Sequence, residues 1–136
     1  MIEAMIASFL TISTPAWGND VSMAQGKWDE FNRIEATCLA ENVYHEARNQ
    51  PLAGQMAVIS VTINRVNDDR FPNSICEVVK QGPHRPSWKG TGEMIPIRHK
   101  CQFSWYCDGK SDKIYDEETY DNIYLLTEGI VSGTFE

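Results

Sequence analysis

The sequence lacks the features that mark nucleic-acid-binding, membrane-spanning and repeat proteins. Its 136 residues contain 12 Lys and Arg against 19 Asp and Glu, and the basic residues form no run. The net charge of −7 argues against a nucleic-acid partner, because such proteins carry a basic surface patch. No apolar run reaches the ~20 residues that span a bilayer. We therefore expect a soluble monomer with no stable membrane insertion.

Recognisable metal and cofactor motifs are also missing. The three histidines, His45, His84 and His99, are scattered, and no Cys-x-x-Cys pair is present. His45-Glu46 opens an HExxH-like pattern, but Asn49 stands where the second histidine of such a zinc site belongs. No Ser/His/Asp or Cys/His order is recognisable. We therefore expect no metal and no cofactor.

Four cysteines are present: Cys38, Cys76, Cys101 and Cys107. An even number in a small chain permits two disulfides, with three possible connectivities. Four buried free thiols are the alternative. Among the disulfide arrangements we favour Cys76 with Cys101 or Cys107, leaving the other of these two for Cys38.

The N-terminal segment, residues 1–18, has some features of an export signal. It is apolar from Ala4 to Ile12, and Ala16-Trp17-Gly18 fits a small-x-small cleavage pattern. Glu3 and the lack of Lys or Arg are atypical for such a signal, so a flexible tail is the alternative. We assign residues 19–35 to a linker and the start of a helix, with 19–26 polar and small.

Apolar periodicity predicts a mainly helical chain. The spacing indicates a helix from Lys27 to about Asn49, where the following proline disfavours helix. Pro51 opens a second helix, although its β-branched stretch 58–63 can alternatively form a strand. A short helix at 74–80 and a last helix, capped by Asp112 or Asp116 and ending near Val131, complete the helical set.

The remaining segments predict the small β component. Residues 81–100 are rich in Gly, Pro and charge and indicate a long loop. Gln102–Tyr106 reads as a strand or the edge of a hairpin, in which Phe103 and Trp105 share a face. The expected class is mainly α (α+β), with a small β-hairpin or short sheet.

Glu46 is the carboxylate that the pattern singles out. At ~100° per residue, Leu39 lies within about 20° of it and Val43 about 60° away, which places Glu46 on the apolar stripe near the helix C-terminus. Burial and the negative end of the helix dipole would both raise its pKa. A carboxyl with a raised pKa can act as a general acid. The structural alternative is a pairing with Arg48 or another basic residue.

A second carboxylate for glycosidase chemistry does not come from the same helix. Glu41 lies about 140° around the axis from Glu46. Glu35 has a similar azimuth but lies ~16 Å away along the axis. A partner must come from elsewhere in the chain, and Asp108 is the nearest candidate by type.

Four ordered blocks resemble a known family. They are Cys38–Arg48, Pro51–Val66, Phe71–Val79 and Cys101–Gly109. In order and spacing they resemble the SleB/CwlJ-type cell wall hydrolases, which include spore cortex-lytic enzymes and phage and proteobacterial relatives. The resemblance covers about residues 36–133. Asn49-Gln50 departs from the Gly-Glu that commonly follows the Glu-Ala-Arg triplet in the family.

The resemblance implies a lysozyme-like, lytic-transglycosylase-like catalytic domain over 36–136 that acts on peptidoglycan in the periplasm or cell wall, or as a phage lysis protein. It implies cleavage between N-acetylmuramic acid and N-acetylglucosamine, with Glu46 as acid and then base while the muramic acid 6-hydroxyl attacks the anomeric carbon. That scheme yields a 1,6-anhydro sugar and can dispense with a second carboxylate. A hydrolytic muramidase on the same site and a non-catalytic wall-binding module are the alternatives.

Five further residues are candidates for substrate contacts. Tyr44 and Gln55 can hydrogen-bond the acid or an acetamido group, although a packed aromatic and a solvated helix residue are equally good interpretations. Phe103, Ser104 and Trp105 suit a sugar-binding edge, with aromatic faces for the ring and polar groups for the N-acetyl arm. The alternative is that one face of this segment belongs to the core.

Overall fold

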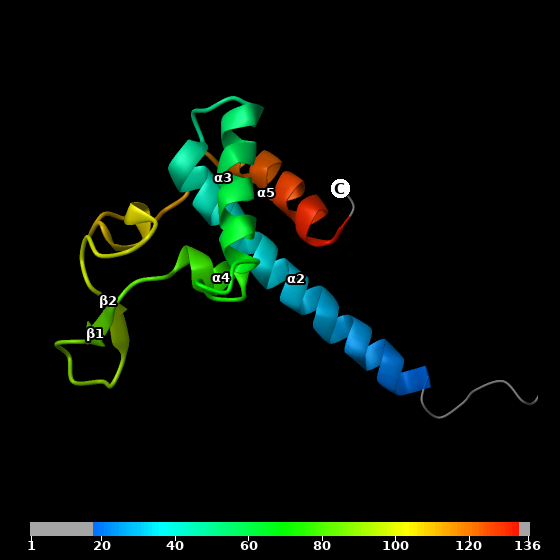
Figure 1. Ribbon diagram of the computed structural model, residues 1–136, viewed down its shortest axis with the longest axis horizontal. Coiled ribbons are helices and arrows are strands. Elements are labelled where there is room, and N and C mark those ends of the chain that lie inside the picture. Colours follow the sequence, from blue (N-terminus) through cyan, green and yellow to red (C-terminus); the bar gives the residue numbers. More distant parts are fainter. Residues whose placement is uncertain (1–17, 134–136) are drawn as a thin grey trace, which may run out of the picture. The chain divides into compact units, whose positions relative to one another are not determined.

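Four α-helices, one short 3-10 helix and a two-stranded sheet make up residues 18–133, the part of the chain that the computed structural model describes (Figure 1). The elements are α2 Gly18–Ala47, α3 Leu52–Val66, α4 Ile75–Val79, β1 His84–Pro86, β2 Met94–Pro96, η1 Ser104–Cys107 and α5 Glu117–Val131. The mainly helical class with a small sheet is confirmed. The candidate signal peptide lies outside the described residues, except for Gly18.

The chain divides into two parts after Phe31, and the described residues of the first part, 18–31, form the beginning of α2. Residues 19–26 are helical, so the helix begins well before Lys27, where the periodicity placed its start. Within this part the Gln25 side chain donates to Asp29 one turn on, at 2.9 Å, and the rings of Trp28 and Phe31 stack with centroids 5.7 Å apart. Such pairs three and four residues apart stabilise a helix locally.

The second part, from Asn32 onward, contains the core. The second half of α2 contributes Leu39, Ala40, Val43 and Tyr44, which pack with one buried isoleucine from α3 and one from α5. A second cluster unites the end of α4 with η1; its members are Val78, Val79, Phe103 and Trp105. Helix α2 therefore carries the side chains on which the other helices of this part assemble.

Three of the expected helix boundaries are confirmed. Helix α3 starts directly after Pro51, and residues 58–63 are helical rather than extended. Ser74 caps α4 by accepting from the backbone N–H of Glu77. Asp116, not Asp112, caps α5, because its carboxylate accepts from the N–H of Thr119.

The β structure lies elsewhere than expected. Residues 81–100 are not all loop, because β1 and β2 form an antiparallel hairpin with Arg85 opposite Ile95. Gln102–Tyr106 is not a strand, because η1 occupies this region. The Cys101–Cys107 disulfide explains the difference, since it holds the two Cα atoms 6.1 Å apart. If the chain from Cys101 to Cys107 were extended, it would span ~20 Å.

The disulfides are Cys38–Cys76 and Cys101–Cys107, so the favoured pairing is wrong. The contacts of Glu35 explain why Cys76 meets α2. The buried Glu35 carboxylate accepts from the backbone N–H groups of Ile75 and Cys76, the first two residues of α4. These N–H groups have no partner inside their own helix, so the carboxylate fixes α4 against α2 and brings the two sulfurs together.

A buried hydrogen-bond chain joins three elements. The indole N–H of Trp105 donates to the side-chain oxygen Oδ1 of Asn42 at 2.8 Å. The Asn42 amide N–H donates to the Thr62 hydroxyl at 3.1 Å, and this hydroxyl donates to the Val58 carbonyl at 2.8 Å. Asn42 and Thr62 are fully buried. This series of hydrogen bonds therefore fixes η1 on α2 and α3 through groups that water does not reach.

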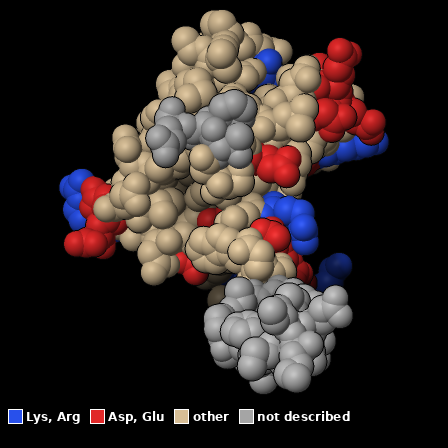
Figure 2. Space-filling view, turned by 90° about the vertical axis from the view of Figure 1, so that its right-hand side faces the viewer, with Lys and Arg blue, Asp and Glu red and all other residues tan. Residues whose placement is uncertain are grey.

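None of the helices between residues 18 and 133 is long and apolar enough to cross a membrane. On the face shown in Figure 2, acidic side chains have basic neighbours in several places, so neither sign of charge dominates it. The net charge of −7 is therefore not gathered into one acidic area on this face.

We expect Asn42→Ala to lower the free energy of unfolding by about 3 kcal/mol, because it leaves the Trp105 N–H buried without an acceptor. Urea unfolding of the variant measures the loss. Asn122→Ala is the matched control, because Asn122 is an exposed residue of α5. An equal, small effect of both substitutions would contradict a structural role for the buried amide.

The two disulfides should contribute unequally to stability. Cys38–Cys76 closes a segment of 38 residues and Cys101–Cys107 one of 6. The loop-entropy relation gives about 4 kcal/mol for the first and about 2 kcal/mol for the second. We expect the double variant Cys38→Ser/Cys76→Ser to unfold at lower denaturant than Cys101→Ser/Cys107→Ser. The reverse order would show that strain or residual structure, rather than loop closure, sets their contributions.

Candidate active site

Glu46 lies in the last turn of α2 and is exposed, so its expected burial is wrong. Its azimuth was correctly placed near that of the buried Leu39. Burial also needs a neighbouring element on the same side of the helix, however, and in this turn Tyr44 and Ala47 are buried whereas His45 is partly exposed and Glu46 is exposed. The C-terminal end of α2 therefore presents Glu46 to solvent.

The Glu46 carboxylate is not used in the fold. Across residues 18–133, no hydrogen bond or ion pair engages it. The structural alternative, a pairing with Arg48, is not formed, because the Arg48 guanidinium lies over the Tyr44 ring, 5.4 Å from its centroid. A carboxylate with no structural partner, at the surface and near the end of a helix, is free to meet a substrate.

The connection between α2 and α3 is tight and brings glutamines close behind Glu46 in the chain. Gln50 donates its backbone N–H to Ala47 at 3.0 Å, and Gln55 donates its side-chain amide to the Gln50 carbonyl at 3.4 Å. Gly54 is required here, because a Cβ on it would lie 2.7 Å from the Gln50 Cβ. Gln55 is half-buried, and its contact with substrate stays a prediction.

Tyr44 is a buried anchor for the start of α5. Only 3% of its surface is exposed, and its hydroxyl accepts from the backbone N–H groups of Tyr115 and Asp116 at 3.2 and 3.1 Å. These are donors that precede the first turn of α5. A substrate contact of Tyr44 stays a prediction.

The expected sugar-binding edge is mostly packed inside the protein. Phe103 and Trp105 are each 8% exposed, whereas Ser104 between them is exposed. The Arg65 guanidinium lies 5.1 Å from the centroid of the Phe103 ring. The Trp105 indole stacks on the His45 imidazole, with centroids 4.4 Å apart and 22° between the planes. The structure therefore places Trp105 against His45, the residue that precedes Glu46 in α2. Of the three expected sugar-binding residues, Ser104 is the most exposed.

Two carboxyl groups that the sequence did not favour have perturbed ionisation. Burial raises the pKa of Glu41, and the charge of Lys80 partly opposes this effect. Burial also raises the pKa of Asp112, with His45 opposing and Asp108 adding to the shift.

His45 interacts with one of these groups, Asp112. Burial lowers its pKa, the negative charge of Asp112 raises it, and the positive charge of Arg48 lowers it. Its Nε2 atom is buried and has no hydrogen-bond partner among the described residues. The neutral imidazole is therefore favoured, stacked on Trp105.

A polar cavity of about 400 Å³ opens beside the end of α2. Its walls come from the last turn of α2 and from the segment that leads into α5; they are Tyr44, His45, Arg48, Asn49, Ser111, Lys113, Tyr115 and Asp116. Glu46 does not line it, although the residues on both sides of Glu46 in the sequence do.

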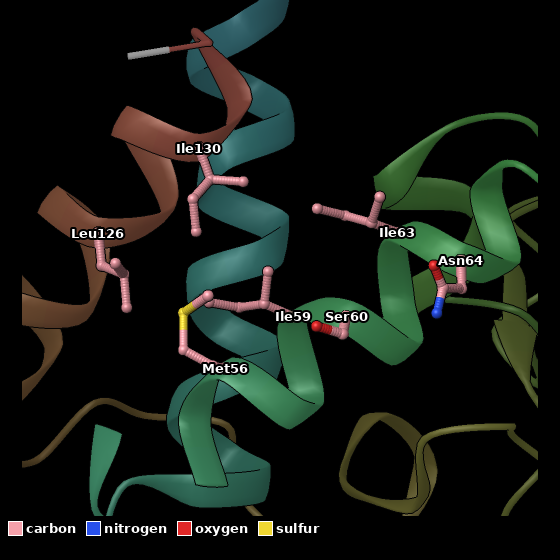
Figure 3. A pocket seen from close by; sticks show the side chains of 7 residues that line it. All are labelled: Met56, Ile59, Ser60, Ile63, Asn64, Leu126 and Ile130. Carbon is pink, nitrogen blue, oxygen red and sulfur yellow. The ribbon is translucent and has the colours of Figure 1, made fainter. Parts of the chain in front are cut away.

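A second cavity, of about 470 Å³, lies between α3 and α5 and is mainly apolar. In Figure 3 the side chains of Met56 and Ile59 point from α3 toward Leu126 and Ile130 of α5. Ser60 and Asn64 supply polar groups at its α3 side, and Ile63 completes the lining. Within residues 18–133, no group of three or more His, Cys, Asp or Glu side chains could hold a metal ion.

Comparison with known proteins places the chain among cell wall hydrolases. The family model described as Cell Wall Hydrolase matches residues 49–134, beginning just after Glu46. A spore cortex-lytic enzyme of Bacillus subtilis (strain 168) is 43% identical over 49 residues, which are 36% of this chain and 16% of that protein. No solved structure matches.

Two more spore cortex-lytic enzymes are similar over short segments. The enzyme of Halalkalibacterium halodurans is 44% identical over 41 residues, 30% of this chain and 12% of that protein. The enzyme of Oceanobacillus iheyensis is 36% identical over 59 residues, 43% of this chain and 20% of that protein. The similarity thus spans a fifth or less of each curated relative.

The ionisation of His45 should depend on Asp112. Asp112→Asn removes a charge that raises the His45 pKa, so we expect that pKa to fall further below 6.5. NMR titration of the imidazole, assigned with His45→Gln, measures the shift, and Asp69→Asn is the control. Because the folded state disfavours protonated His45, its contribution to stability should diminish as the pH falls from 6.5 through the folded pKa. An unchanged titration in Asp112→Asn would contradict this coupling.

Proposed function

The chain belongs to the cell wall hydrolase family, and from this premise we propose that it is an enzyme that cleaves the glycan strand of peptidoglycan. The proposed bond joins N-acetylmuramic acid to N-acetylglucosamine, and the proposed place of action is the extracytoplasmic cell wall. The match over residues 49–134 is the observation that carries the proposal. The names of two relatives, both spore cortex-lytic enzymes, are consistent with it.

Glu46 is the proposed acid. Its exposed carboxylate, at the end of α2, is accessible to a polymer that no enclosed cavity could accept. A bound glycan would displace water from the carboxyl group and supply the desolvation that the free protein lacks. The proton affinity needed for acid catalysis would thus arise on binding.

In the proposed reaction, protonated Glu46 gives its proton to the glycosidic oxygen as the bond to the anomeric carbon breaks. The resulting carboxylate then takes the proton of the muramic acid 6-hydroxyl, whose oxygen bonds to the same carbon. The products are a 1,6-anhydromuramic end and a free N-acetylglucosamine end, and no water is consumed. Hydrolysis would use a water molecule instead of the 6-hydroxyl and leave a reducing end.

Asp108 and Glu41 are the carboxyl groups to test beside Glu46. Asp108 accepts from the backbone N–H of Lys110 at 2.8 Å, and its charge acts on His45 and Asp112. Glu41 has the raised pKa expected of a general acid, caused first by burial. It is therefore the second candidate for the acid, on a different side of α2.

We expect Glu46→Gln to abolish release of soluble fragments from purified peptidoglycan, with a loss of at least about 100-fold, the usual contribution of a general acid. Glu128→Gln, which changes an exposed carboxylate of α5, is the matched control and should retain activity. Mass spectrometry of the fragments identifies the products. Anhydro-muropeptides would support the transglycosylase, whereas reducing muramic acid ends would support a muramidase.

Two other outcomes would contradict the proposal. Loss of activity in Glu41→Gln with full activity in Glu46→Gln would transfer the acid to Glu41. A lack of release by the unaltered protein from several kinds of wall, together with retained wall binding, would favour a non-catalytic binding module.

A further inference from the structure

We propose that the polar cavity beside the end of α2 binds a carboxylate of the peptide stem of peptidoglycan. The proposal deepens the proposed function and rests on it, because it concerns recognition of the same substrate. The cavity is lined by Arg48 and Asn49 on one side and by Ser111 and Lys113 on the other. Its volume of about 400 Å³ is within the range of sites for small ligands.

Two cations in the cavity have no anionic partner. The described part of the chain has one ion pair, Arg70 with Asp68, so neither Arg48 nor Lys113 is neutralised by a carboxylate. Each lies instead over an aromatic ring of the cavity wall. The Arg48 guanidinium is 5.4 Å from the centroid of Tyr44, and the Lys113 ammonium is 5.4 Å from that of Tyr115. Such contacts hold a cation in place without using up its hydrogen-bond donors.

Asp116 also lines the cavity, but its carboxylate does not pair with Arg48 or Lys113. Asp116 accepts from the backbone N–H and the hydroxyl of Thr119, at 3.1 and 2.6 Å. These bonds lower the Asp116 pKa and commit the carboxylate to capping α5. The charges of Asp112 and Asp108 act on His45, which also lines the cavity. An external anion would therefore meet two available cations in a protein whose net charge is −7.

The neutral groups of the cavity suit a peptide better than a bare ion. Asn49 offers an amide that can both donate and accept, and Ser111 offers a hydroxyl. In peptidoglycan the N-acetylated sugars are neutral, whereas the stem peptide carries amides and free carboxylates. A guanidinium and an ammonium together select the carboxylate, and the polar neutral groups select the adjoining amides.

The location relates this cavity to the proposed acid. Tyr44, His45, Arg48 and Asn49 flank Glu46 in the last turn of α2 and in the residues that follow it. Because the stem peptide is attached to muramic acid, a stem bound here would bring its sugar toward the end of the helix that carries Glu46. Recognition of the stem would thus position the strand for cleavage.

The test uses binding, which does not depend on cleavage. N-acetylmuramyl dipeptide with free carboxylates is titrated into the full chain and followed by NMR chemical shifts. We expect Arg48→Gln and Lys113→Gln each to weaken binding about tenfold, the size of one charge-assisted hydrogen bond. Lys110→Gln, an exposed lysine outside the cavity, is the matched control. Both variants replace exposed side chains, so circular dichroism should show an intact fold.

Three results would overturn the proposal: equal binding of a dipeptide with amidated carboxylates, equal binding of inorganic phosphate, or unchanged affinity in both variants. A second arm separates this failure from that of the proposed function. Peptidoglycan freed of its stems by an amidase, with the lactyl carboxylates that this hydrolysis exposes converted to amides, should be cleaved with a KM about tenfold higher than intact material. Cleavage of both materials with one KM would refute stem recognition and retain the enzyme, whereas cleavage of neither would refute the proposed function.

Discussion

The side-chain amide of Asn42 is the constraint on which the arrangement of the second part of the chain depends. It lies fully buried on α2, accepts from the Trp105 indole and donates to Thr62 on α3. Leaving a buried donor or acceptor without a partner costs more free energy than an ordinary hydrogen bond contributes. A shifted packing of these elements would break each hydrogen bond of this series and is therefore unfavourable. The amide thereby determines where the loop closed by Cys101–Cys107 meets the helices.

Successive turns of α2 hold different segments. Glu35 and Cys38 bind the start of α4, the Ala36 carbonyl accepts from Thr127 of α5, and the Tyr44 hydroxyl holds the first residues before α5. All of these contacts precede Glu46 in the chain. The helix thus provides a rigid base for the last turn, while the Glu46 side chain itself takes part in none of the contacts. Proteins gain precision at a site when fixed elements carry the functional group and other residues hold those elements.

The local pattern predicted what depends on local physics. Periodicity and capping located α3, α4 and α5, because the spacing of apolar residues and the presence of Pro51, Ser74 and Asp116 act within a few residues. The disulfide pairing was not predictable in this way, since it follows from Glu35 binding the start of α4 across about forty residues. The prediction that Glu46 is buried was wrong for a related reason. An azimuth is a property of one helix, whereas burial depends on which other segment reaches the same turn.

The exposure of Glu46 gives the proposed mechanism a particular logic. A general acid can owe a raised pKa to a permanent apolar pocket in the free protein. Here the free protein leaves the carboxylate in water, and the substrate strand itself would have to cover it. Desolvation would then be driven by contacts made away from the scissile bond, which is how remote binding energy contributes to catalysis. The cations of the polar cavity are suited to that task, because they attract a part of the substrate that does not react. Acidity at Glu46 and recognition of the stem peptide would in this way be two consequences of one binding event.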